Sequence, residues 1–346
     1  MSSKIKVAVI GLGIGKSHLK GYQSHPDAEI VAVCDLNQEL GAQIAAEYKV
    51  PKIFTDAEKM FKECELDAVS VCTPNKFHAP LTMTALEHGL HVLCEKPMAM
   101  NTDEAIQMND LAKKKKKNLM INFSYRFNPM SYALKQEVDK GTFGDIYFGR
   151  TVWHRRRGMP KFGGWFGDKE LSGGGPLIDL GVHRVDLALW LMGYPEPVSV
   201  FGSTYNPIAM EQAKKENKKY TVEDLACGIV KFKNGATLIV EASWAANIKD
   251  KEEMNTRLCG TKGGLMQYNL NGEYKFEADM YTDSDGFFYT KKLDFTTAQV
   301  PAPAYEFVDS IKNKRPPLAT GDEGIKVMKI LDGIYTSAAT GKQVTW

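Results

Sequence analysis

Short apolar runs alternate with amphipathic segments through the first third of the chain. Five runs are rich in β-branched residues and almost wholly apolar, as strands covered on both faces must be. They lie at 5–10, 29–35, 68–73, 91–95 and 119–123. Helical patterns fill the gaps, at 17–24, 38–48, 80–88 and 102–115. Strands that alternate with helices form β-α-β units, so this pattern predicts an α/β domain with a parallel sheet.

The pattern changes after Phe123. A helix is predicted from Asn128-Pro129 to about Lys140, and extended segments then dominate. Asn234-Gly235 joins two of these segments and is a strong hairpin signal. The expected strands cover 146–153, 198–205, 225–232, 236–244, 265–268, 274–278 and 288–293. We interpret the polar segment 210–219 as an exposed excursion between strands. The pattern predicts an α+β domain with an open-faced, mainly antiparallel sheet and a C-terminal helix over about 322–340.

Length and charge narrow the class of protein. The chain has 346 residues, more than one typical domain of roughly 100–200 residues. We therefore predict two domains, residues 1–123 and residues 124–346. Charged residues make up 25% and the net charge is only +2, so a general nucleic-acid or membrane-surface partner is not expected.

The sequence contains few features that indicate the cellular compartment of the protein. The apolar run that begins at Ile5 is too short for a signal peptide, and no run reaches the ~20 apolar residues of a membrane helix. The six cysteines are scattered without a C-x-x-C pair, which favours reduced, buried thiols over disulfides or a metal site. We predict a cytoplasmic protein that binds no metal.

A glycine-rich loop follows the first predicted strand, at Gly11-Leu12-Gly13-Ile14-Gly15. Such a turn between a strand and a helix lets backbone N–H groups approach a pyrophosphate, which the helix N-terminus stabilises. The match to G-x-G-x-x-G is imperfect, because the third glycine should stand at position 16 and Gly15 comes one residue early. Gly11, Gly13, Ile14 and Gly15 are the predicted phosphate contacts.

An acidic residue ends the second predicted strand. Asp35 lies about 20 residues after the loop, where a carboxylate accepts hydrogen bonds from the adenosine ribose. A carboxylate there repels a 2′-phosphate, and Leu36-Asn37 offers no arginine to bind one, so NAD is favoured over NADP. A helix N-cap is the compatible structural role for Asp35.

A lysine follows the strand at 91–95, in the tripeptide Glu95-Lys96-Pro97. This is the carboxyl edge where open α/β sheets hold their ligands. Proline at this point ends the strand and can be cis. A lysine directed into a cleft can steer a hydroxyl proton, and a surface lysine at a strand end is the alternative.

The second candidate motif follows three glycines, Gly173 to Gly175. Asp179 and His183 are four residues apart, so they share one face in the first turn of a predicted helix. The glycines would let a ligand approach the helix end closely. Histidine is the natural general base near neutral pH, and a neighbouring carboxylate can orient its ring. A helix-surface pair without chemistry is the alternative.

Taken together, these motifs resemble the Gfo/Idh/MocA family of sugar and inositol dehydrogenases across essentially the full chain. The early glycine is the one departure. The matching segments are the 11–18 loop, Thr73-Pro74-Asn75-x-x-His78, Glu95-Lys96-Pro97, Tyr125-Arg126 and Asp179-x-Gly-x-His183-x-x-Asp186.

The resemblance implies a Rossmann domain that binds NAD and a C-terminal sheet that often mediates homo-oligomers. It places Thr73, Pro74, Asn75 and His78 along the cofactor, near the nicotinamide half, and Glu95 and Lys96 beside it. It also implies that Lys96, Asp179 and His183 form the catalytic set, with Tyr125 and Arg126 facing the substrate.

A long loop before the predicted catalytic helix suggests the substrate. It carries His154, Arg155, Arg156 and Trp165, and arginine and tryptophan bind hydroxyl groups and sugar faces. A basic surface loop with buried tryptophans is the alternative. We expect oxidation of a secondary hydroxyl of a sugar or glycoside, with C3 of a glucosyl unit as first choice. Oxidation of myo- or scyllo-inositol is the second.

Three other functions remain open from the sequence. A non-catalytic NAD-sensing protein would keep the loop and Asp35 but could discard Lys96 or His183, and both are present. A sugar-phosphate substrate would also require arginines. Some relatives oxidise a glycoside only transiently with bound NAD, and the sequence does not separate them from a net dehydrogenase.

Overall fold

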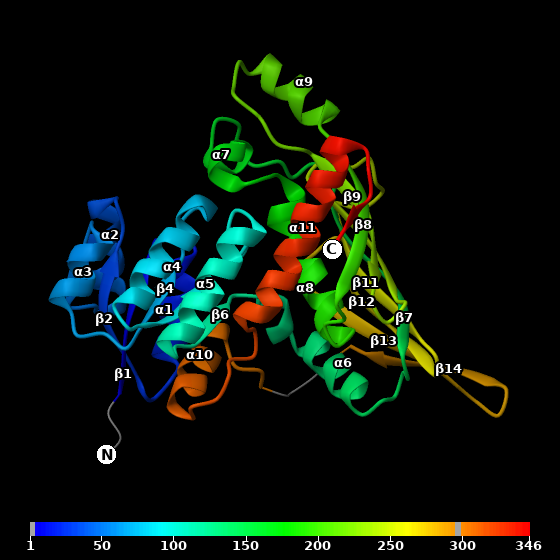
Figure 1. The fold of residues 1–346 in the computed structure, drawn as a ribbon, viewed down its shortest axis with the longest axis horizontal. Helices are drawn as coiled ribbons and strands as arrows, with labels where there is room; N and C mark the ends of the chain where they lie inside the picture. The colour runs from blue at the N-terminus through cyan, green and yellow to red at the C-terminus, as the bar shows by residue number, and fades with distance from the viewer. Residues whose placement is uncertain (1–3, 295–298) are drawn as a thin grey trace. The chain divides into compact units, whose positions relative to one another are not determined.

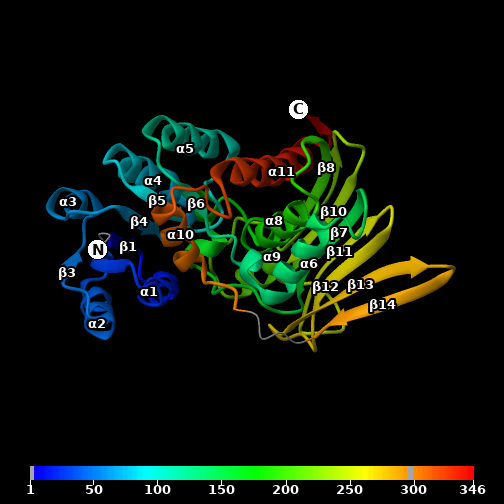
Figure 2. The same ribbon diagram turned by 90° about the horizontal axis from the view of Figure 1, so that it is seen from below.

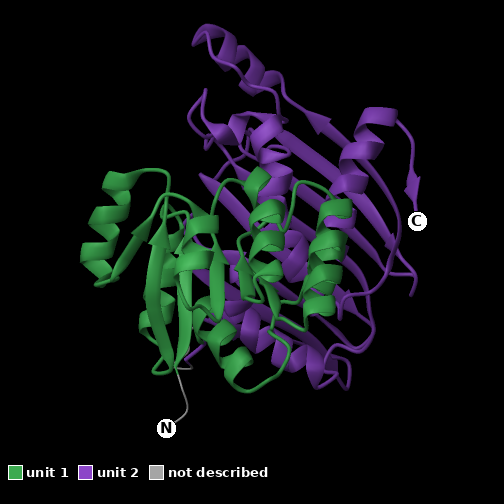
Figure 3. Ribbon diagram, turned by 60° about the vertical axis from the view of Figure 1, so that its left-hand side comes forward, with its two compact units in different colours: residues 1–123, 301–325 green, residues 124–300, 326–346 purple. Residues whose placement is uncertain are grey.

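The computed structural model describes residues 4–294 and 299–346, and contacts divide the chain into two compact units (Figure 3). Unit 1 holds Met1–Phe123 with Pro301–Ile325, and unit 2 holds Ser124–Val300 with Lys326–Trp346. The boundary after Phe123 falls where the pattern changes. The return of 301–325 to unit 1 was not expected from the sequence. Residues 1–3 and 295–298 of the two predicted domains lie outside the described residues.

Unit 1 is built on a six-stranded parallel sheet in the order β3-β2-β1-β4-β5-β6. This is the strand order of the classical dinucleotide-binding fold, so the α/β prediction is confirmed. In Figure 2, α4 and α5 lie on one face of the sheet and α1 and α2 on the other. The strands are β1 (Ile5–Ile10), β2 (Ala28–Cys34), β3 (Lys52–Phe54), β4 (Ala68–Val71), β5 (His91–Cys94) and β6 (Leu119–Ile121). The helices are α1 (Gly15–Gln23), α2 (Gln38–Tyr48), α3 (Ala57–Glu63), α4 (His78–Glu87), α5 (Thr102–Lys115) and α10 (Pro303–Lys312).

Side-chain caps fix where two of these helices begin. Asn101 caps α5 by accepting the N–H of Glu104 at 2.9 Å. Asn37 caps α2 by accepting the N–H of Leu40, so the N-cap role considered for Asp35 was wrong. Strand β3 and helix α3 escaped prediction because each is too short to show a clear period.

Helix α10 returns the chain to unit 1. A Cβ added at Gly21 of α1 would lie 2.9 Å from Cβ of Ala304, so glycine lets the two helices approach closely. The chain then runs beside β6, where Ile121 donates its N–H to Ala319 O at 3.0 Å. These contacts explain why 301–325 belongs to unit 1 rather than to a continuous second domain.

Unit 2 is built on a nine-stranded, mainly antiparallel sheet in the order β14-β13-β12-β11-β7-β10-β9-β8-β15 (Figure 1). The α+β prediction is confirmed, but β7 and β10 pair in parallel, so the sheet is not a simple meander. Strand β11 was not predicted. The strands are β7 (Ile146–Arg155), β8 (Pro197–Tyr205), β9 (Leu225–Phe232), β10 (Thr237–Ser243), β11 (Glu252–Gly260), β12 (Gly263–Asn269), β13 (Phe276–Ser284), β14 (Phe287–Leu293) and β15 (Val344–Thr345).

The two faces of this sheet differ in character. Thr151 and Trp153 of β7 and Met254 of β11 lie on one face, which helices cover, and all three are buried. The opposite face carries Phe201 and Ile229, which are 50% and 49% exposed. The helices of unit 2 are α6 (Pro129–Asp139), α7 (Lys169–Ser172), α8 (Val182–Leu191), α9 (Pro207–Lys215) and most of α11 (Gly321–Thr340).

Part of the predicted excursion at 210–219 is helical, because α9 continues to Lys215. Pro207 stands in its first turn, where a missing N–H costs nothing. Within residues 4–294 and 299–346, no helix is long and apolar enough to cross a membrane. The six cysteines are free thiols, and four of them are buried.

Candidate active site

The glycine-rich loop carries out three separate tasks. Gly11 turns the chain with a φ of 85°, and a Cβ there would lie 2.5 Å from Cys72 O. A Cβ at Gly13 would meet no atom of the described residues within 4 Å, so this side of the loop is open to a ligand. A Cβ at Gly15 would lie 2.8 Å from Cγ1 of Val9, so this glycine packs helix α1 against β1. The early glycine therefore does the packing expected of the third glycine of the motif.

Asp35 stands beside this loop at the end of β2. Its Oδ2 accepts the N–H of Leu12 at 2.8 Å and its Oδ1 accepts the N–H of Asn37 at 2.8 Å. These bonds fix the carboxylate against the glycine-rich loop and leave lone pairs for further donors. Ile14 and Leu36 are 56% and 90% exposed, and apolar surface of this kind suits contact with a flat base.

The Thr73–His78 segment follows β4. The hydroxyl of Thr73 is buried and has no hydrogen-bond partner among the described residues, and Pro74 leads into the short helix that begins at Asn75. His78 is buried, with ring nitrogens 2.7 Å from Pro97 O and 2.8 Å from Thr73 O. Burial lowers the pKa of His78 and outweighs these two carbonyl acceptors. His78 thus ties two loops together, and we do not propose it as a direct cofactor ligand.

Glu95 belongs to a buried polar network. Its Oε1 accepts Nδ2 of Asn122 at 2.6 Å and lies 2.9 Å from Nε2 of His18. The other ring nitrogen of His18 lies 2.9 Å from Ser70 Oγ, which is bonded to Tyr22. Burial raises the pKa of Glu95, but the bonds from His18 and Asn122 and nearby positive charge lower it to about 2.

This network supports the backbone at Lys96. The backbone N–H of Lys96 donates to Oε2 of Glu95 at 3.1 Å, and the Lys96–Pro97 peptide bond is cis. Glu95 is 6% exposed, so we do not propose its side chain as a cofactor ligand. The open loop at Gly13, the carboxylate of Asp35 and the unpartnered hydroxyl of Thr73 suit a bound dinucleotide.

In unit 2, Asp179 and His183 lie on two consecutive helical segments. Asp179 is in η4 (Leu177–Gly181), one π-helical turn, and His183 is in the first turn of α8. π-Turns inside helices are rare and often mark functional sites. Nε1 of Trp244 donates to Oδ2 of Asp179 at 3.1 Å. Sequence reasoning missed Trp244, which stands one residue beyond β10 and is fully buried.

The glycines before η4 make room for protein atoms, not for a ligand. A Cβ at Gly174 would collide with the hydroxyl of Tyr335, and one at Gly175 with the backbone of Glu223. The buried Glu223 carboxylate accepts N–H groups of Gly175 at 2.9 Å and Leu177 at 3.1 Å. Tyr335 donates to the same carboxylate at 2.8 Å. The expectation that these glycines admit a ligand was wrong, because Glu223 and Tyr335 fill that space.

Two aromatic side chains pack against His183. The ring centroids of Tyr125 and Trp153 lie 5.1 Å and 5.8 Å from that of His183. Burial raises the pKa of the Tyr125 hydroxyl to about 12. Nε1 of Trp153 donates to Oε2 of Glu252 at 3.2 Å, which fixes its ring. Of these two rings, Tyr125 is only partly buried, and a ring of this kind can bind the apolar face of a sugar.

Two predicted substrate contacts face elsewhere. Arg126 is fully buried, donating to Asp186 at 2.6 Å and 3.0 Å and to the hydroxyl of Tyr194. His154 is on the open face of the sheet, 3.7 Å from Glu241, whereas its neighbour Trp153 is on the helix-covered face with His183. We therefore do not propose Arg126 or His154 as substrate ligands.

The remaining predicted contacts lie nearer to His183 or on exposed loops. Arg155 shares the sheet face of Trp153 and pairs with Glu252 at 2.8 Å. Burial lowers the pKa of Arg155, but Tyr274, Glu252 and Asp179 have the larger combined effect, so the pKa lies above its ordinary value. Arg156 is exposed and bonded to the carbonyl of Lys249, and Trp165 stacks on Phe166.

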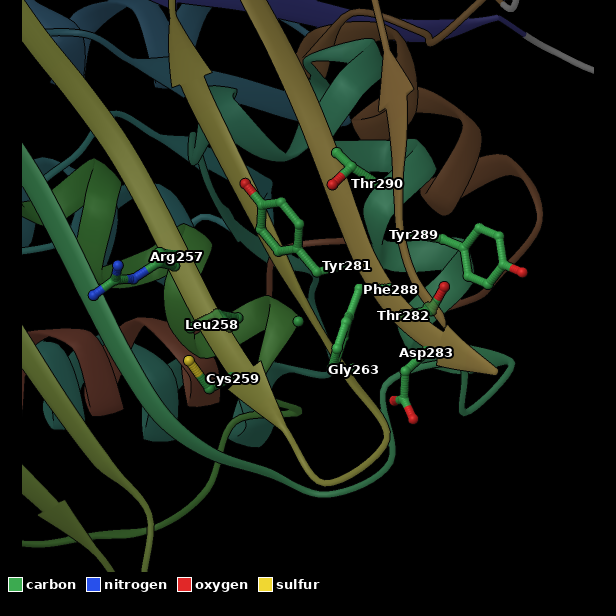
Figure 4. A pocket seen from close by; sticks show the side chains of 11 residues that line it. Arg257, Leu258, Cys259, Gly263, Tyr281, Thr282, Asp283, Phe288, Tyr289 and Thr290 are labelled. Atoms are coloured by element: carbon green, nitrogen blue, oxygen red, sulfur yellow. The ribbon is translucent and has the colours of Figure 1, made fainter. Parts of the chain in front are cut away.

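A surface hollow near the end of the sheet is unrelated to these residues. Arg257, Cys259, Tyr281 and Phe288 line it from the open face, as Figure 4 shows. His183 packs on the opposite face, beside Trp153. Within the described residues, no cluster of three or more acidic, histidine or cysteine side chains could hold a metal ion.

Comparison with known protein families identifies the class. Residues 5–123 match the NAD-binding Rossmann fold of the oxidoreductase family GFO_IDH_MocA, and residues 132–266 match a GFO/IDH/MocA C-terminal domain. The chain belongs to the Gfo/Idh/MocA family of NAD-dependent oxidoreductases. The predicted family, cofactor and enzyme class are confirmed.

Individual relatives are more varied. The D-glucoside 3-dehydrogenase of Escherichia coli (strain K12) is 35% identical over 354 residues, covering 99% of this chain and 98% of the relative. The myo-inositol 2-dehydrogenase of Thermotoga maritima is 26% identical and covers 92% of each chain. The structure of a levoglucosan dehydrogenase with NADH and levoglucosan has a TM-score of 0.86 at 23% identity, covering 99% of each chain.

Proposed function

We propose that the enzyme oxidises the C3 hydroxyl of a glucosyl unit and produces a 3-oxo-glycoside. The observation that carries this proposal is the full-length similarity to the D-glucoside 3-dehydrogenase, at 35% identity. The other relatives named above act on different substrates and share less identity with this chain. Methyl and aryl glucosides are therefore the first substrates to test, and inositols the second.

His183 is the proposed general base, and Lys96 the proposed partner of the reacting oxygen. His183 accepts the hydroxyl proton, and the Lys96 ammonium hydrogen-bonds the same oxygen and stabilises its developing negative charge. Bound NAD⁺ supplies the hydride acceptor. Asp179, held by Trp244, is the proposed partner of a neighbouring hydroxyl or of the histidine.

The surroundings of His183 suit a carbohydrate. Tyr125 is only partly buried and offers aromatic surface, the buried Trp153 holds it in place, and Arg155 offers donors to hydroxyl groups on the same side of the sheet. An aromatic wall also suits an aglycone, which is why a glycoside is preferred to a free sugar. We place the substrate contacts at these residues instead of Arg126 and His154.

The position of oxidation can be tested with an isotope. Methyl glucoside deuterated at C3 is incubated with enzyme and NAD⁺, and the coenzyme is analysed by mass spectrometry. Deuterium in the NADH, together with a 3-oxo product, supports the proposal. Unlabelled NADH with deuterium retained in the product contradicts oxidation at C3 while leaving dehydrogenase activity in place.

A further inference from the structure

Arg184 is a buried cation that pairs with no carboxylate of residues 4–294 or 299–346. Its side chain is fully buried, and a guanidinium stays charged at any pH a protein tolerates. Nη1 donates to Oε1 of Gln267 at 2.9 Å, but Nε and Nη2 have no hydrogen-bond partner among the described residues. Arg126, equally buried in the same unit, is paired with Asp186. Burial lowers the pKa of Arg184, and the side chain of Tyr125 is the largest of the contacts that offset this effect, so the charge depends on neutral neighbours.

Three aromatic rings surround this guanidinium. Cζ of Arg184 lies 4.5 Å from the ring centroid of Tyr125, 5.3 Å from that of Phe276 and 5.6 Å from that of Trp153. The faces of aromatic rings attract cations, most strongly where water is excluded. Tyr125 also packs edge-on against Trp153 and Phe276, so the rings and the cation form one cluster.

The same cluster borders the proposed general base. Tyr125 and Trp153, which contact Arg184, also contact His183, the preceding residue on α8. A change at Arg184 therefore acts on His183 in two ways, through the position of these rings and through the electric field.

We propose that Arg184 is a positioning residue. Its guanidinium, surrounded by aromatic rings, holds the Tyr125 and Trp153 rings against His183, and its positive charge favours the neutral, proton-accepting imidazole. This inference rests on the proposed role of His183 as general base. A general base must be unprotonated to act, so a nearby fixed positive charge keeps it available at lower pH.

Other charged groups around the cluster act in both directions. Asp179 on η4 and Glu252 on β11 carry negative charge that favours protonation of His183, whereas Arg155 on β7 opposes it. The tyrosines Tyr125 and Tyr274 are neutral near pH 7. Because these groups remain in every variant described below, a difference between variants reports on Arg184.

The decisive experiment is a titration of His183 in the full-length protein. Histidine labelled with ¹³C at Cε1 is observed by NMR between pH 5 and 9, and the His183→Asn variant identifies the resonance. Arg184→Met, which keeps length but removes charge, should raise the pKa of His183 by roughly one unit, because removing a nearby positive charge at an effective dielectric of ~20 favours the protonated ring. Arg184→Gln replaces it if Arg184→Met does not fold.

Two further variants make the result specific. Arg184→Lys keeps the charge and should leave the pKa of His183 close to its original value. Lys233→Met removes an exposed charge from the turn between β9 and β10 and should change nothing. An unchanged pKa in the charge-removing variant, or an equal shift in Arg184→Lys, overturns the inference.

Kinetics separate this inference from the proposed function. In Arg184→Met, the acidic limb of the pH profile of kcat/KM should move to higher pH, by the same number of pH units as the pKa of His183 in the titration. A limb that stays in place while the His183 titration shifts overturns the positioning role. Full turnover in His183→Asn would instead contradict the proposed function, whatever the titration of Arg184→Met shows.

Discussion

At the scale of single residues, the two proposed catalytic side chains follow or contact buried groups that fix their surroundings. Lys96 comes directly after Glu95, whose carboxylate accepts the lysine's own N–H. His183 stands between aromatic rings that other buried groups hold in place. Proton transfer needs such fixed geometry, because a small displacement of a catalytic group costs much of its rate.

Replacing either catalytic residue should remove turnover without removing the cofactor. Lys96→Ala and His183→Ala should each lower kcat by roughly 10²–10⁴-fold, the usual contribution of a positioned acid or base. The dissociation constant of NAD⁺, measured by calorimetry, should change little. Lys20→Ala, on the exposed side of α1, is the control. Unchanged turnover in either variant would refute the assigned roles.

The Glu95 network should make the free energy of unfolding depend on pH in the acidic range. The folded pKa of Glu95 is about 2 and its ordinary value is 4.5, so its stabilisation is complete above about pH 4.5 and is lost as pH falls towards 2. Glu95→Gln places an amide donor against other donors and should cost roughly 1–3 kcal/mol at pH 7. In thermal melts of both proteins between pH 3 and 7, the difference in melting temperature should narrow as the pH falls. Parallel melting curves would contradict this origin of stability.

At the scale of elements, glycines set how closely helices and loops approach their neighbours. Gly15 lets α1 pack on β1, and Gly174 and Gly175 let Tyr335 and Glu223 reach the start of η4. Glu223 then satisfies N–H groups that η4 leaves without partners, as an N-terminal carboxylate does. The helical turn that carries Asp179 is thus fixed by residues far away in sequence.

Two glycines of the same loop should respond oppositely to substitution. Gly13→Ala adds a methyl group on the open side, so the melting temperature should stay unchanged while NAD⁺ binds at least tenfold more weakly. Gly15→Ala forces the methyl group towards Val9 and should lower the melting temperature by several degrees. Calorimetric titration and thermal melts on both variants test this. Equal NAD⁺ affinity in Gly13→Ala and the unmodified protein would contradict the proposed phosphate approach.

The elements were predicted best where a local period exists. Helices α2 and α5 and strands β1 and β9 begin and end where the pattern placed them. Strand β11 was missed because its buried residues include polar Asn255 and Thr256, which break the expected alternation. The parallel pairing of β7 with β10 joins strands about 90 residues apart, and no local pattern reports such pairing.

At the scale of the whole molecule, the described helices of unit 2 cover one face of its nine-stranded sheet and leave the other face open (Figure 2). Phe201 on β8 and Ile229 on β9 are paired neighbours on that face and are half exposed. Exposed apolar surface of this kind marks protein interfaces. We therefore propose that the sheet face joins copies of the chain, as the family resemblance implies.

Light scattering tests this assembly. The unmodified protein should elute as an oligomer, and Ile229→Lys should shift it towards the monomer because an unpaired charge would be buried in the interface. Ile53→Lys, an exposed aliphatic residue of unit 1, is the matched control. A monomer before any substitution would remove the proposal.

The candidate site was only partly accessible from sequence. Lys96, Asp179 and His183 could be named because they stand in short motifs at predicted element ends. Trp244, Glu223 and Arg184 carry no such signal, since each acts through contacts with residues distant in the chain. The direction in which Arg126 points depends on its ion pair with Asp186. The direction in which His154 points depends on the register of β7, because successive side chains of a strand point to opposite faces of the sheet.

The most direct measurement is NADH absorbance at 340 nm after the purified enzyme and NAD⁺ are mixed with glucosides, free hexoses and inositols. The proposed function predicts NADH with glucosides and a 3-oxo product in the same wells. NADH with inositols alone would contradict the substrate assignment. Altered glycosides without NADH would indicate transient oxidation by bound NAD rather than net dehydrogenation. Intact NAD binding with no product from any substrate would contradict the proposed function.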